Sequence, residues 1–206
     1  MCAMALKLYY TPGACSLSPH IALREAGVPF ELVQVDLGAK KLKDGGDYFA
    51  VNPKGYVPAL GLEDGQVLTE GAVIVQYVAD LAPEKKLAPK AGTLARVRLQ
   101  EWLHFIATEL HKGFGPINNP KSNPEIKQFF RQRLDARFQI LASGLEKREF
   151  LGDEGFSVAD GYAFYTLRNL RRLDSAALEQ STVLKPYFDR IAARPAVRAA
   201  LEAEGL

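Results

Sequence analysis

The chain has 206 residues, which allows one or two domains, and apolar residues make up 48% of it. Lysine and arginine total 26 against 24 aspartate and glutamate, so the net charge of +2 argues against nucleic acid as the main partner. Two cysteines cannot build a disulfide framework or a zinc knuckle, and they are typical of a reducing compartment. No apolar run approaches about 18 residues, so we expect no membrane span, and without a targeting signal we expect a cytoplasmic location.

The first part of the chain is predicted to be an α/β domain. Its opening pattern of strand, helix and strand within about thirty residues indicates a βαβ unit with parallel strands. A mostly irregular stretch with room for one short helix follows, and then a strand pair and a helix. The expected elements are strands at Leu6–Tyr10, Phe30–Leu37, Val57–Leu62 and Val67–Leu68, a helix from Ser16 to Ala26 closed by Gly27, a turn at Asp64-Gly65, and a helix from Ala72 to Leu81 capped by Thr69.

The second part is predicted to be all-α. The stretch from Pro83 to Gly92 is polar, contains two prolines and lacks periodicity, which is typical of an interdomain linker. We therefore expect one domain over residues 1–84, a linker over 85–92 and a helical domain over 93–206. The helices expected there are Leu94–Lys112, Glu125–Leu145, Val158–Leu173 and at least one within Pro186–Glu204, with a break at Pro195.

Cys15 is the most informative residue for function. It follows Pro12-Gly13 directly after the first strand and opens a helix, whose N-terminus carries about half a positive charge and unpaired N–H groups. Both stabilise a thiolate, so we expect a more acidic thiol than that of a free cysteine; a small buried apolar residue is the alternative. Ser18 occupies the position of the second cysteine in dithiol redox motifs, so a mixed disulfide at Cys15 would need an external thiol to resolve it.

Val57-Pro58 indicates a second functional position. Proline cannot donate to a sheet ladder, so it belongs at an edge or a bend. A cis bond would turn the backbone N–H and C=O of Val57 outward, where they could pair with an extended peptide as an added strand does. An ordinary trans proline at an edge strand is the alternative.

The segment Thr69-Glu70-Gly71-Ala72 opens the next expected helix. Its exposed N–H groups can hold a carboxylate, while the Glu70 side chain can accept from an ammonium group. A ligand with both an α-amino and an α-carboxyl group would fit here. Ordinary capping by Thr69 explains the same residues without a ligand.

Three polar residues mark one face of the first long helix of the second half. His104, Thr108 and His111 stand at spacings of four and three, with Lys112 adjacent. A solvent-facing stripe is the alternative to a functional one. The two histidines are seven residues apart and form no i, i+4 pair, so we expect no metal site. Further on, Ser157-x-x-Asp160 is a capping box that starts a core helix.

Together these residues resemble the glutathione transferases, and specifically the bacterial beta class with a cysteine in the active site. The resemblance covers essentially the whole chain after a five-residue extension, and the opening motif is highly specific. Its motifs are Lys7–His20 (KLYYTPGACSLSPH), Asn52-Pro53-Lys54-Gly55 before Val57-Pro58, Leu68-Thr69-Glu70-Gly71, and Glu109-Leu110-His111-Lys112-Gly113.

The resemblance implies a thioredoxin-like domain with a mixed four-stranded sheet, an α-helical domain, and an apolar acceptor pocket between them. It implies glutathione as co-substrate, an apolar or aromatic electrophile as partner, a homodimer, and no prosthetic group, metal, membrane or nucleic acid. Cys15 would face the glutathione sulfur and Val57 would pair with the central residue of the peptide. The remaining implied roles are Glu70 and Gly71 at the γ-glutamyl end, Lys40 on the glycine carboxylate, and His104, Thr108, His111 and Lys112 completing the site from the partner subunit.

The function that we expect is conjugation of reduced glutathione to electrophiles, with Cys15, His111 and Ser16 as catalytic candidates. His111 or Ser16 would donate to the glutathione sulfur or relay its proton. Three alternatives are a thiol-transferase, a reductive dehalogenase that requires Cys15, and a non-catalytic carrier. The chain departs from the family pattern where Tyr56 replaces Gln, His104 replaces Asn, Thr108 replaces Ser, and Asn169 replaces a large aromatic of the acceptor pocket.

Overall fold

A computed structural model describes residues 5–206 of the chain, and Cys2, to which the sequence assigns no role, lies outside them. By residue contacts the chain forms two units, one of residues up to Ala88 together with Ala193–Leu206, and the other of Pro89–Ala192. The last fourteen residues therefore group with the α/β unit, which differs from the expected division. The reason is that helix α9 (Pro195–Glu204) packs along helix α1 (Leu17–Ala26). Among residues 5–206, no helix is long and apolar enough to cross a membrane.

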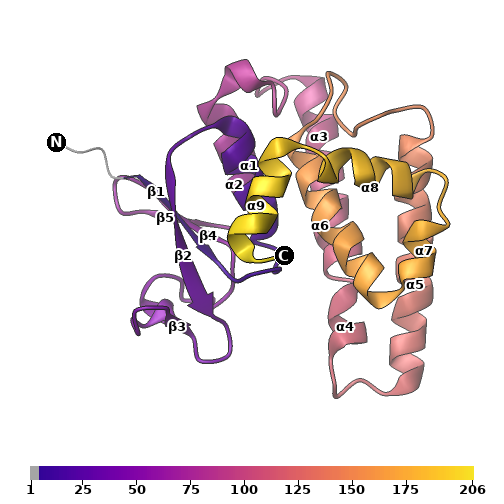
Figure 1. Ribbon diagram of the computed structural model, residues 1–206, viewed down its shortest axis with the longest axis horizontal. Coiled ribbons are helices and arrows are strands. Elements are labelled where there is room, and N and C mark those ends of the chain that lie inside the picture. Colours follow the sequence, from indigo (N-terminus) through magenta and orange to yellow (C-terminus); the bar gives the residue numbers. More distant parts are fainter. Residues whose placement is uncertain (1–4) are drawn as a thin grey trace. The chain divides into compact units, whose positions relative to one another are not determined.

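The α/β unit is built on a mixed sheet of five strands in the order β3-β2-β1-β4-β5. The central strand β1 runs parallel to β2 and antiparallel to β4, and Leu8 pairs with Leu32 on one side and Leu60 on the other. In Figure 1 helices α1, α2 (Gly71–Leu81) and α9 lie to the same side of this sheet. The strands are β1 (Leu6–Tyr10), β2 (Phe30–Asp36), β3 (Lys41–Leu42), β4 (Ala59–Gly61) and β5 (Val67–Thr69).

The period-two pattern of the first strand explains its place at the centre of the sheet. Leu6, Leu8 and Tyr10 are buried, whereas Lys7 is exposed. Helix α1 covers the sheet with Leu17 and Ile21, both fully buried, and ends at Gly27 in the left-handed conformation. The predicted βαβ unit with parallel strands is thus confirmed.

Two local predictions for this unit were wrong. The stretch after β2 contains a fifth strand, β3, because Lys41 and Leu42 pair with Asp36 and Val35 across a tight reversal; the short helix in the stretch is a 3₁₀ turn at Tyr48–Ala50. Thr69 does not cap the next helix. It ends β5, and Glu70 is the N-cap residue of α2 (Gly71–Leu81), with no side-chain hydrogen bond to the helix.

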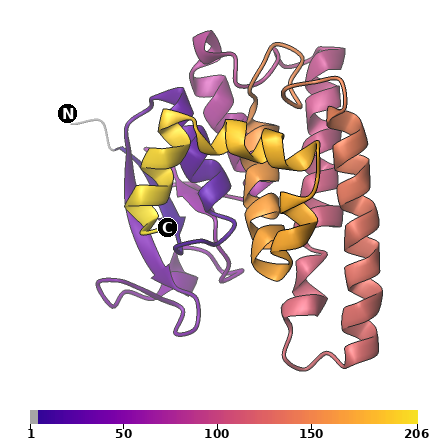
Figure 2. The same cartoon turned by 45° about the vertical axis from the view of Figure 1, so that its right-hand side comes forward.

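The second unit is helical, as predicted, and Figure 2 shows its long helix α5. Two short helices, α4 and α7, carry too few residues to show a period in the sequence. The expected helix from Leu94 to Lys112 is α-helical only to Phe105 and continues as a π-helical segment, η3. Its elements are α3 (Leu94–Phe105), η3 (Ile106–His111), α4 (Phe114–Asn118), α5 (Pro124–Leu145), α6 (Val158–Leu173), α7 (Ser175–Glu179) and α8 (Leu184–Ala192).

Helix α6 is the core of this unit, and it begins with the predicted capping box. The Asp160 carboxylate is fully buried and accepts from the backbone N–H of Ser157 at 2.8 Å and its hydroxyl at 2.7 Å. It also accepts from the Leu151 N–H at 2.8 Å and the Tyr187 hydroxyl at 2.7 Å. One carboxylate therefore fixes the start of α6, the loop before it and helix α8.

Candidate functional site

Cys15 lies in the loop between β1 and α1, one residue before the N-cap residue Ser16. Its side chain is partly buried, and Sγ donates to the carbonyl oxygen of Val57 at 3.2 Å. The two residues that the sequence assigned to a reacting sulfur and to a peptide-binding edge are thus in direct contact.

Ser16 is used inside this loop. Its fully buried hydroxyl accepts from the Thr11 N–H at 3.2 Å and donates to the Thr11 carbonyl at 3.3 Å. A hydroxyl has one proton, so this arrangement leaves none for a substrate sulfur. Ser16 closes the turn that presents Cys15, and a catalytic role for it would require this pair of bonds to open.

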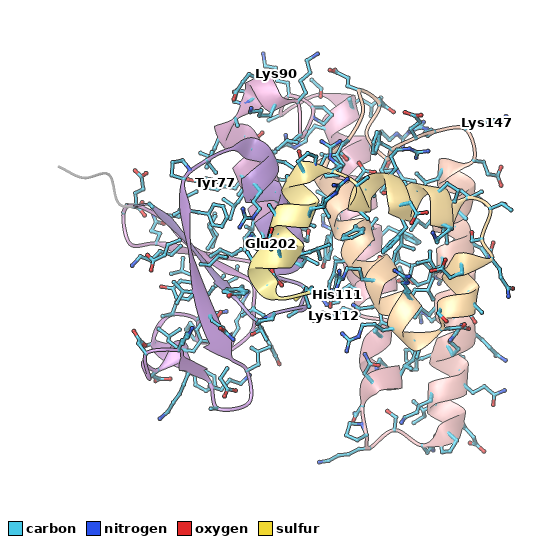
Figure 3. All side chains as sticks on the ribbon, in the orientation of Figure 1. Tyr77, Lys90, His111, Lys112, Lys147 and Glu202 are labelled. Atoms are coloured by element: carbon cyan, nitrogen blue, oxygen red, sulfur yellow. The ribbon has the colours of Figure 1, made fainter. Side chains whose placement is uncertain are left out.

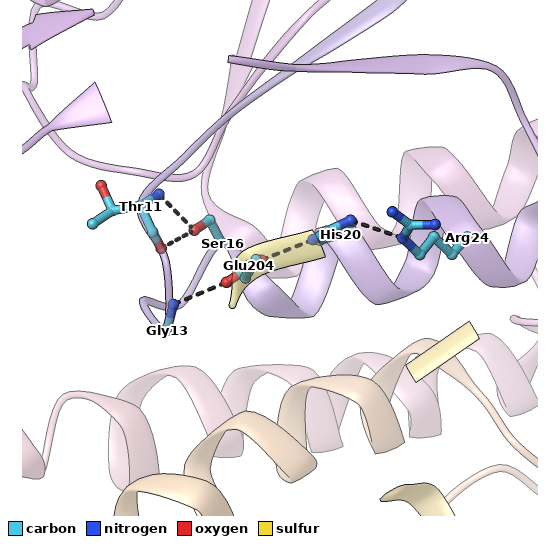
Figure 4. A network of polar contacts seen from close by, with 6 residues as sticks. All are labelled: Thr11, Gly13, Ser16, His20, Arg24 and Glu204. Carbon is cyan, nitrogen blue, oxygen red and sulfur yellow. Dashed lines mark hydrogen bonds and ion pairs between the residues drawn. The ribbon is translucent and has the colours of Figure 1, made fainter. Parts of the chain in front are cut away.

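A network of polar contacts involving Glu204, His20 and Arg24 also holds this loop (Figure 4). The Glu204 carboxylate, at the end of α9, accepts from the Gly13 N–H at 2.9 Å and contacts Nδ1 of His20 at 2.8 Å. Arg24 Nε–H donates to His20 Nε2 at 2.9 Å, so Nε2 is the acceptor and the proton of a neutral ring sits on Nδ1. The Glu204 and His20 side chains are both fully buried. The C-terminal helix therefore fixes the loop two residues before Cys15.

The Val57-Pro58 bond is cis, which resolves the alternatives left open by the sequence. The carbonyl just before it, that of Tyr56, accepts from the Tyr48 hydroxyl at 2.8 Å and from the Asn52 side-chain amide at 2.8 Å. Burial raises the pKa of Tyr48 to about 12, so its hydroxyl remains a donor. Two buried side chains thus hold the backbone in place immediately before Val57.

Lys40 and Glu70 share an unusual backbone conformation. Their φ angles are +57° and +69°, and among residues 5–206 the only other non-glycine residue with a positive φ is Lys86. Side chains disfavour this region, and such strain is frequent at functional sites. Lys40 Nζ donates to the Gly55 carbonyl at 2.8 Å and lies 5.6 Å from the Tyr56 ring centre. Glu70 directly precedes the first turn of α2, whose N–H groups begin at Gly71.

The three polar residues that were expected to share one face differ in exposure. His104 and Thr108 are exposed and bond back to their own helix, His104 Nδ1 to the Gln100 carbonyl and Thr108 Oγ1 to the His104 carbonyl, both at 2.9 Å. His111, which ends the π-helical segment, is only partly buried. Lys112 follows it on the surface, and Figure 3 labels both.

Tyrosines of α6 surround His111. Its Nδ1 lies 2.8 Å from the Tyr162 hydroxyl, and the Tyr165 ring packs edge-on at 5.2 Å between ring centres. Burial, with a smaller contribution from the Lys112 charge, lowers the pKa of His111 from 6.5 to about 4. The imidazole is therefore neutral near pH 7. With Nδ1 bonded to Tyr162, Nε2 is the nitrogen left for a second partner.

Comparison with known proteins agrees with this geometry. Residues 13–81 match the model of the glutathione S-transferase N-terminal domain, and residues 105–195 match that of the C-terminal domain. The chain is 46% identical to the glutathione S-transferase GstA of Escherichia coli O157:H7, over 98% of this chain and 100% of that protein.

The chain belongs to the glutathione S-transferase family.

Solved structures support the beta-class resemblance. The bacterial glutathione S-transferase BphK, solved as a ternary complex, is 54% identical with a TM-score of 0.92 over 97% of this chain and 100% of that one. A beta-class enzyme from Sphingomonas chungbukensis is 44% identical with a TM-score of 0.91, over 97% of this chain and 99% of that one. A sphingomonad glutathione S-transferase complexed with glutathione gives the same identity, TM-score and coverage.

For this glutathione S-transferase, sequence reasoning missed three residues: two that contact candidate site residues, and Glu204, which contacts the loop that carries Cys15. Glu204 and Tyr162 lie 191 and 51 positions from their partners Gly13 and His111, and no sequence spacing links them. Lys54 contacts Glu70 across 16 positions, although it stands within the motif Asn52-Pro53-Lys54-Gly55. Among residues 5–206 no cluster of three or more His, Cys, Asp or Glu side chains could hold a metal ion.

The Glu204 network gives a stability prediction. Glu204→Ala leaves the Gly13 N–H and His20 Nδ1–H buried without their acceptor, so we expect the free energy of unfolding to fall by about 3 kcal/mol. Urea unfolding followed by circular dichroism measures this change. Glu202→Ala, on the exposed side of the same helix, is the control and should change stability by less than about 0.5 kcal/mol. Equal losses in both variants would contradict the assignment.

The partly buried His111 predicts a pH dependence. The folded ring has a lowered pKa, so the unfolded chain binds the extra proton first as the pH falls. The stabilising contribution of the neutral ring is complete above about pH 6.5 and is lost towards pH 4, by about 3 kcal/mol in total. Stability curves of wild type and His111→Gln should therefore converge as the pH falls through this window. NMR titration of the His111 ring with a midpoint above pH 6 would refute the prediction.

Proposed function

We propose that this glutathione S-transferase binds reduced glutathione on its α/β unit and adds the glutathione sulfur to electrophilic small molecules. The observation that carries the proposal is the contact between Cys15 Sγ and the Val57 carbonyl at 3.2 Å. It joins a cysteine at the start of a helix to a backbone edge next to a cis-proline, where an extended peptide can pair. A cysteine-containing peptide bound at Val57 would have its own thiol next to Cys15.

The two ends of a γ-glutamyl tripeptide fit the other candidate residues. Glu70 supplies a carboxylate for the α-ammonium group, and the N–H groups that begin at Gly71 suit the α-carboxylate. Lys40 supplies a cation for the glycine carboxylate and would exchange its present bond to the Gly55 carbonyl for that ion pair. The strained backbone of Lys40 and Glu70 supports a functional reason for their placement.

The proposed reaction needs no redox step. The glutathione thiol loses its proton, the sulfur forms a bond to the electrophilic carbon, and a leaving group departs with the bonding electrons or the double bond takes up a proton. Donors that face the sulfur lower the cost of forming the thiolate. We keep His111, with His104, Thr108 and Lys112, as the helical unit's candidates for contacts with glutathione or its sulfur, and an apolar or aromatic electrophile as the second substrate.

Conjugation is favoured over the alternatives because two relatives that match 98% of the chain, at 46% and 36% identity, are named glutathione S-transferases. A route through a Cys15–glutathione disulfide remains a second chemistry of the same site, and the contact of Cys15 with Val57 favours it. It requires an oxidised partner such as glutathione disulfide, whose sulfur is attacked by the Cys15 thiolate while reduced glutathione leaves.

The cytoplasmic location of the protein also stays a prediction.

Cys15→Ala separates the two chemistries. Glutathione brings its own thiol, so conjugation to a chromogenic aryl halide should stay within about threefold of wild type, whereas the disulfide with glutathione should vanish. Kinetics measures the first, and peptide mass spectrometry after glutathione disulfide treatment measures the second, with Cys2 as the internal control. Loss of conjugation in Cys15→Ala would favour the disulfide route. Failure of wild type to bind S-methylglutathione in calorimetry would reject the proposed function.

We also propose a homodimer, supported by apolar side chains exposed on both units. On α2 these are Val73 and Leu81, which are 50% and 44% exposed, and on α3 they are Leu94 and Val97, which are 70% and 49% exposed. A second copy of the chain would cover them.

A charge placed among the exposed apolar side chains of α3 should disrupt the dimer. We expect Val97→Glu to elute as a monomer in size-exclusion chromatography with light scattering, whereas wild type elutes at twice the monomer mass, because a buried unpaired carboxylate opposes association. Ile140→Glu is the matched control on α5, where the side chain is 47% exposed, and it should leave the mass unchanged. A monomeric wild type would contradict the proposal.

A further inference from the structure

A rigid turn places Lys54 next to the glutathione-binding edge. Asn52 is buried, its Oδ1 accepts from the Lys54 N–H at 3.1 Å, and its Nδ2 donates to the Tyr56 carbonyl at 2.8 Å. Gly55 has φ +65°, and a Cβ there would lie 2.7 Å from the Phe49 ring, so glycine is strongly favoured at this position. The backbone of Lys54 is thus fixed by the same amide that holds the residue before Val57.

The Lys54 side chain reaches the residues that start α2. Nζ donates to Oε1 of Glu70 at 2.9 Å and to the Thr69 hydroxyl at 3.0 Å. The two partners together fix the direction from which the cation approaches the carboxylate. Only one oxygen of the carboxylate takes part, and Oε2 can accept from a second cation.

This ion pair is not explained by stability. The side chains of Lys54 and Glu70 are 53% and 68% exposed, and exposed pairs of this kind contribute little to folding. Glu70 nevertheless occupies a backbone conformation that side chains disfavour, with φ +69°. Glu70 is thus a strained residue paired with an exposed cation. This suggests that the pair serves to fix the position of the Glu70 carboxylate and adds little to the stability of the fold.

We propose that Lys54 is a positioning residue that sets the Glu70 carboxylate for the α-ammonium group of the substrate, and so contributes to selection of γ-glutamyl ligands. The inference rests on the proposed function and adds a residue to which the sequence assigned no role. Because Lys54 holds Oε1 of Glu70, the Glu70 side chain is already ordered when the ligand arrives. Ligand binding then loses less side-chain entropy. Lys54 would then affect glutathione affinity and leave the chemical step at the sulfur unchanged.

Lys54→Met tests this in steady-state kinetics and calorimetry. We expect the KM for glutathione and the Kd for S-methylglutathione to rise about fivefold, with kcat within about twofold of wild type. Lys54→Arg keeps the cation and should restore most of the affinity. Lys121→Met is the matched control on an exposed lysine of the helical unit and should bind as wild type does. An unchanged or lowered KM in Lys54→Met would overturn the proposal, the lowered value showing that Lys54 competes with the ligand for Glu70.

A ligand without the ammonium group shows whether Lys54 acts through Glu70. Glutaryl-cysteinyl-glycine lacks only the α-amino group of that end and keeps the carboxylate, so its S-methyl derivative makes no ion pair with Glu70. Lys54→Met should weaken its binding less than twofold. A full fivefold loss with this ligand would show that Lys54 contacts the ligand elsewhere, and would overturn the role through Glu70. Wild type that fails to bind S-methylglutathione rejects the proposed function itself, which distinguishes that failure from a failure of Lys54.

Discussion

The buried carboxylate of Glu204 is the constraint on which the candidate site depends. It binds a backbone N–H of the Cys15 loop and the ring of His20, and both its side chain and that of His20 are shielded from water. A buried acceptor of this kind is costly to leave unpaired, so the loop and helix α9 must hold their relative positions. The last helix of the chain therefore takes part in presenting a residue near the beginning of it, and this is why the C-terminal residues group with the α/β unit.

A second constraint acts on the segment that ends at Val57, whose carbonyl accepts from Cys15. The Asn52 amide holds both Lys54 and the Tyr56 carbonyl, Lys40 donates to the carbonyl of Gly55, and the cis peptide bond follows directly. One short turn thus connects the residues proposed for the glycine end, the central residue and the γ-glutamyl end of glutathione. These are fixed by hydrogen bonds before any ligand is present, which lowers the entropy that binding would otherwise lose.

The two units carry different kinds of group. The α/β unit offers backbone edges, charges and a thiol, whereas the helical unit offers a neutral imidazole set among tyrosine rings. His111 ends a π-helical segment, and such segments occur often at functional sites because they displace side chains from the ordinary helical faces. His111 is partly buried, whereas His104 and Thr108 are exposed.

The sequence by itself determined those features of the structure that depend on residues close together in the chain. The βαβ unit, the left-handed close of α1 at Gly27, the capping box at Ser157 and the long helices followed from periodicity and turn chemistry, and the motifs around Cys15, Val57 and Glu70 indicated the family. The sequence did not predict strand β3, because two residues are too few to show a strand period. It did not predict the π-helical segment, because a shift in the hydrogen-bond register leaves no mark on the hydrophobic pattern. Only the tertiary structure decided the cis isomer at Pro58, because it depends on the backbone around that residue. The same holds for the hydrogen-bond partners of Cys15, Glu70, His111 and Glu204. Each partner is brought from 16 to 191 positions away in the sequence.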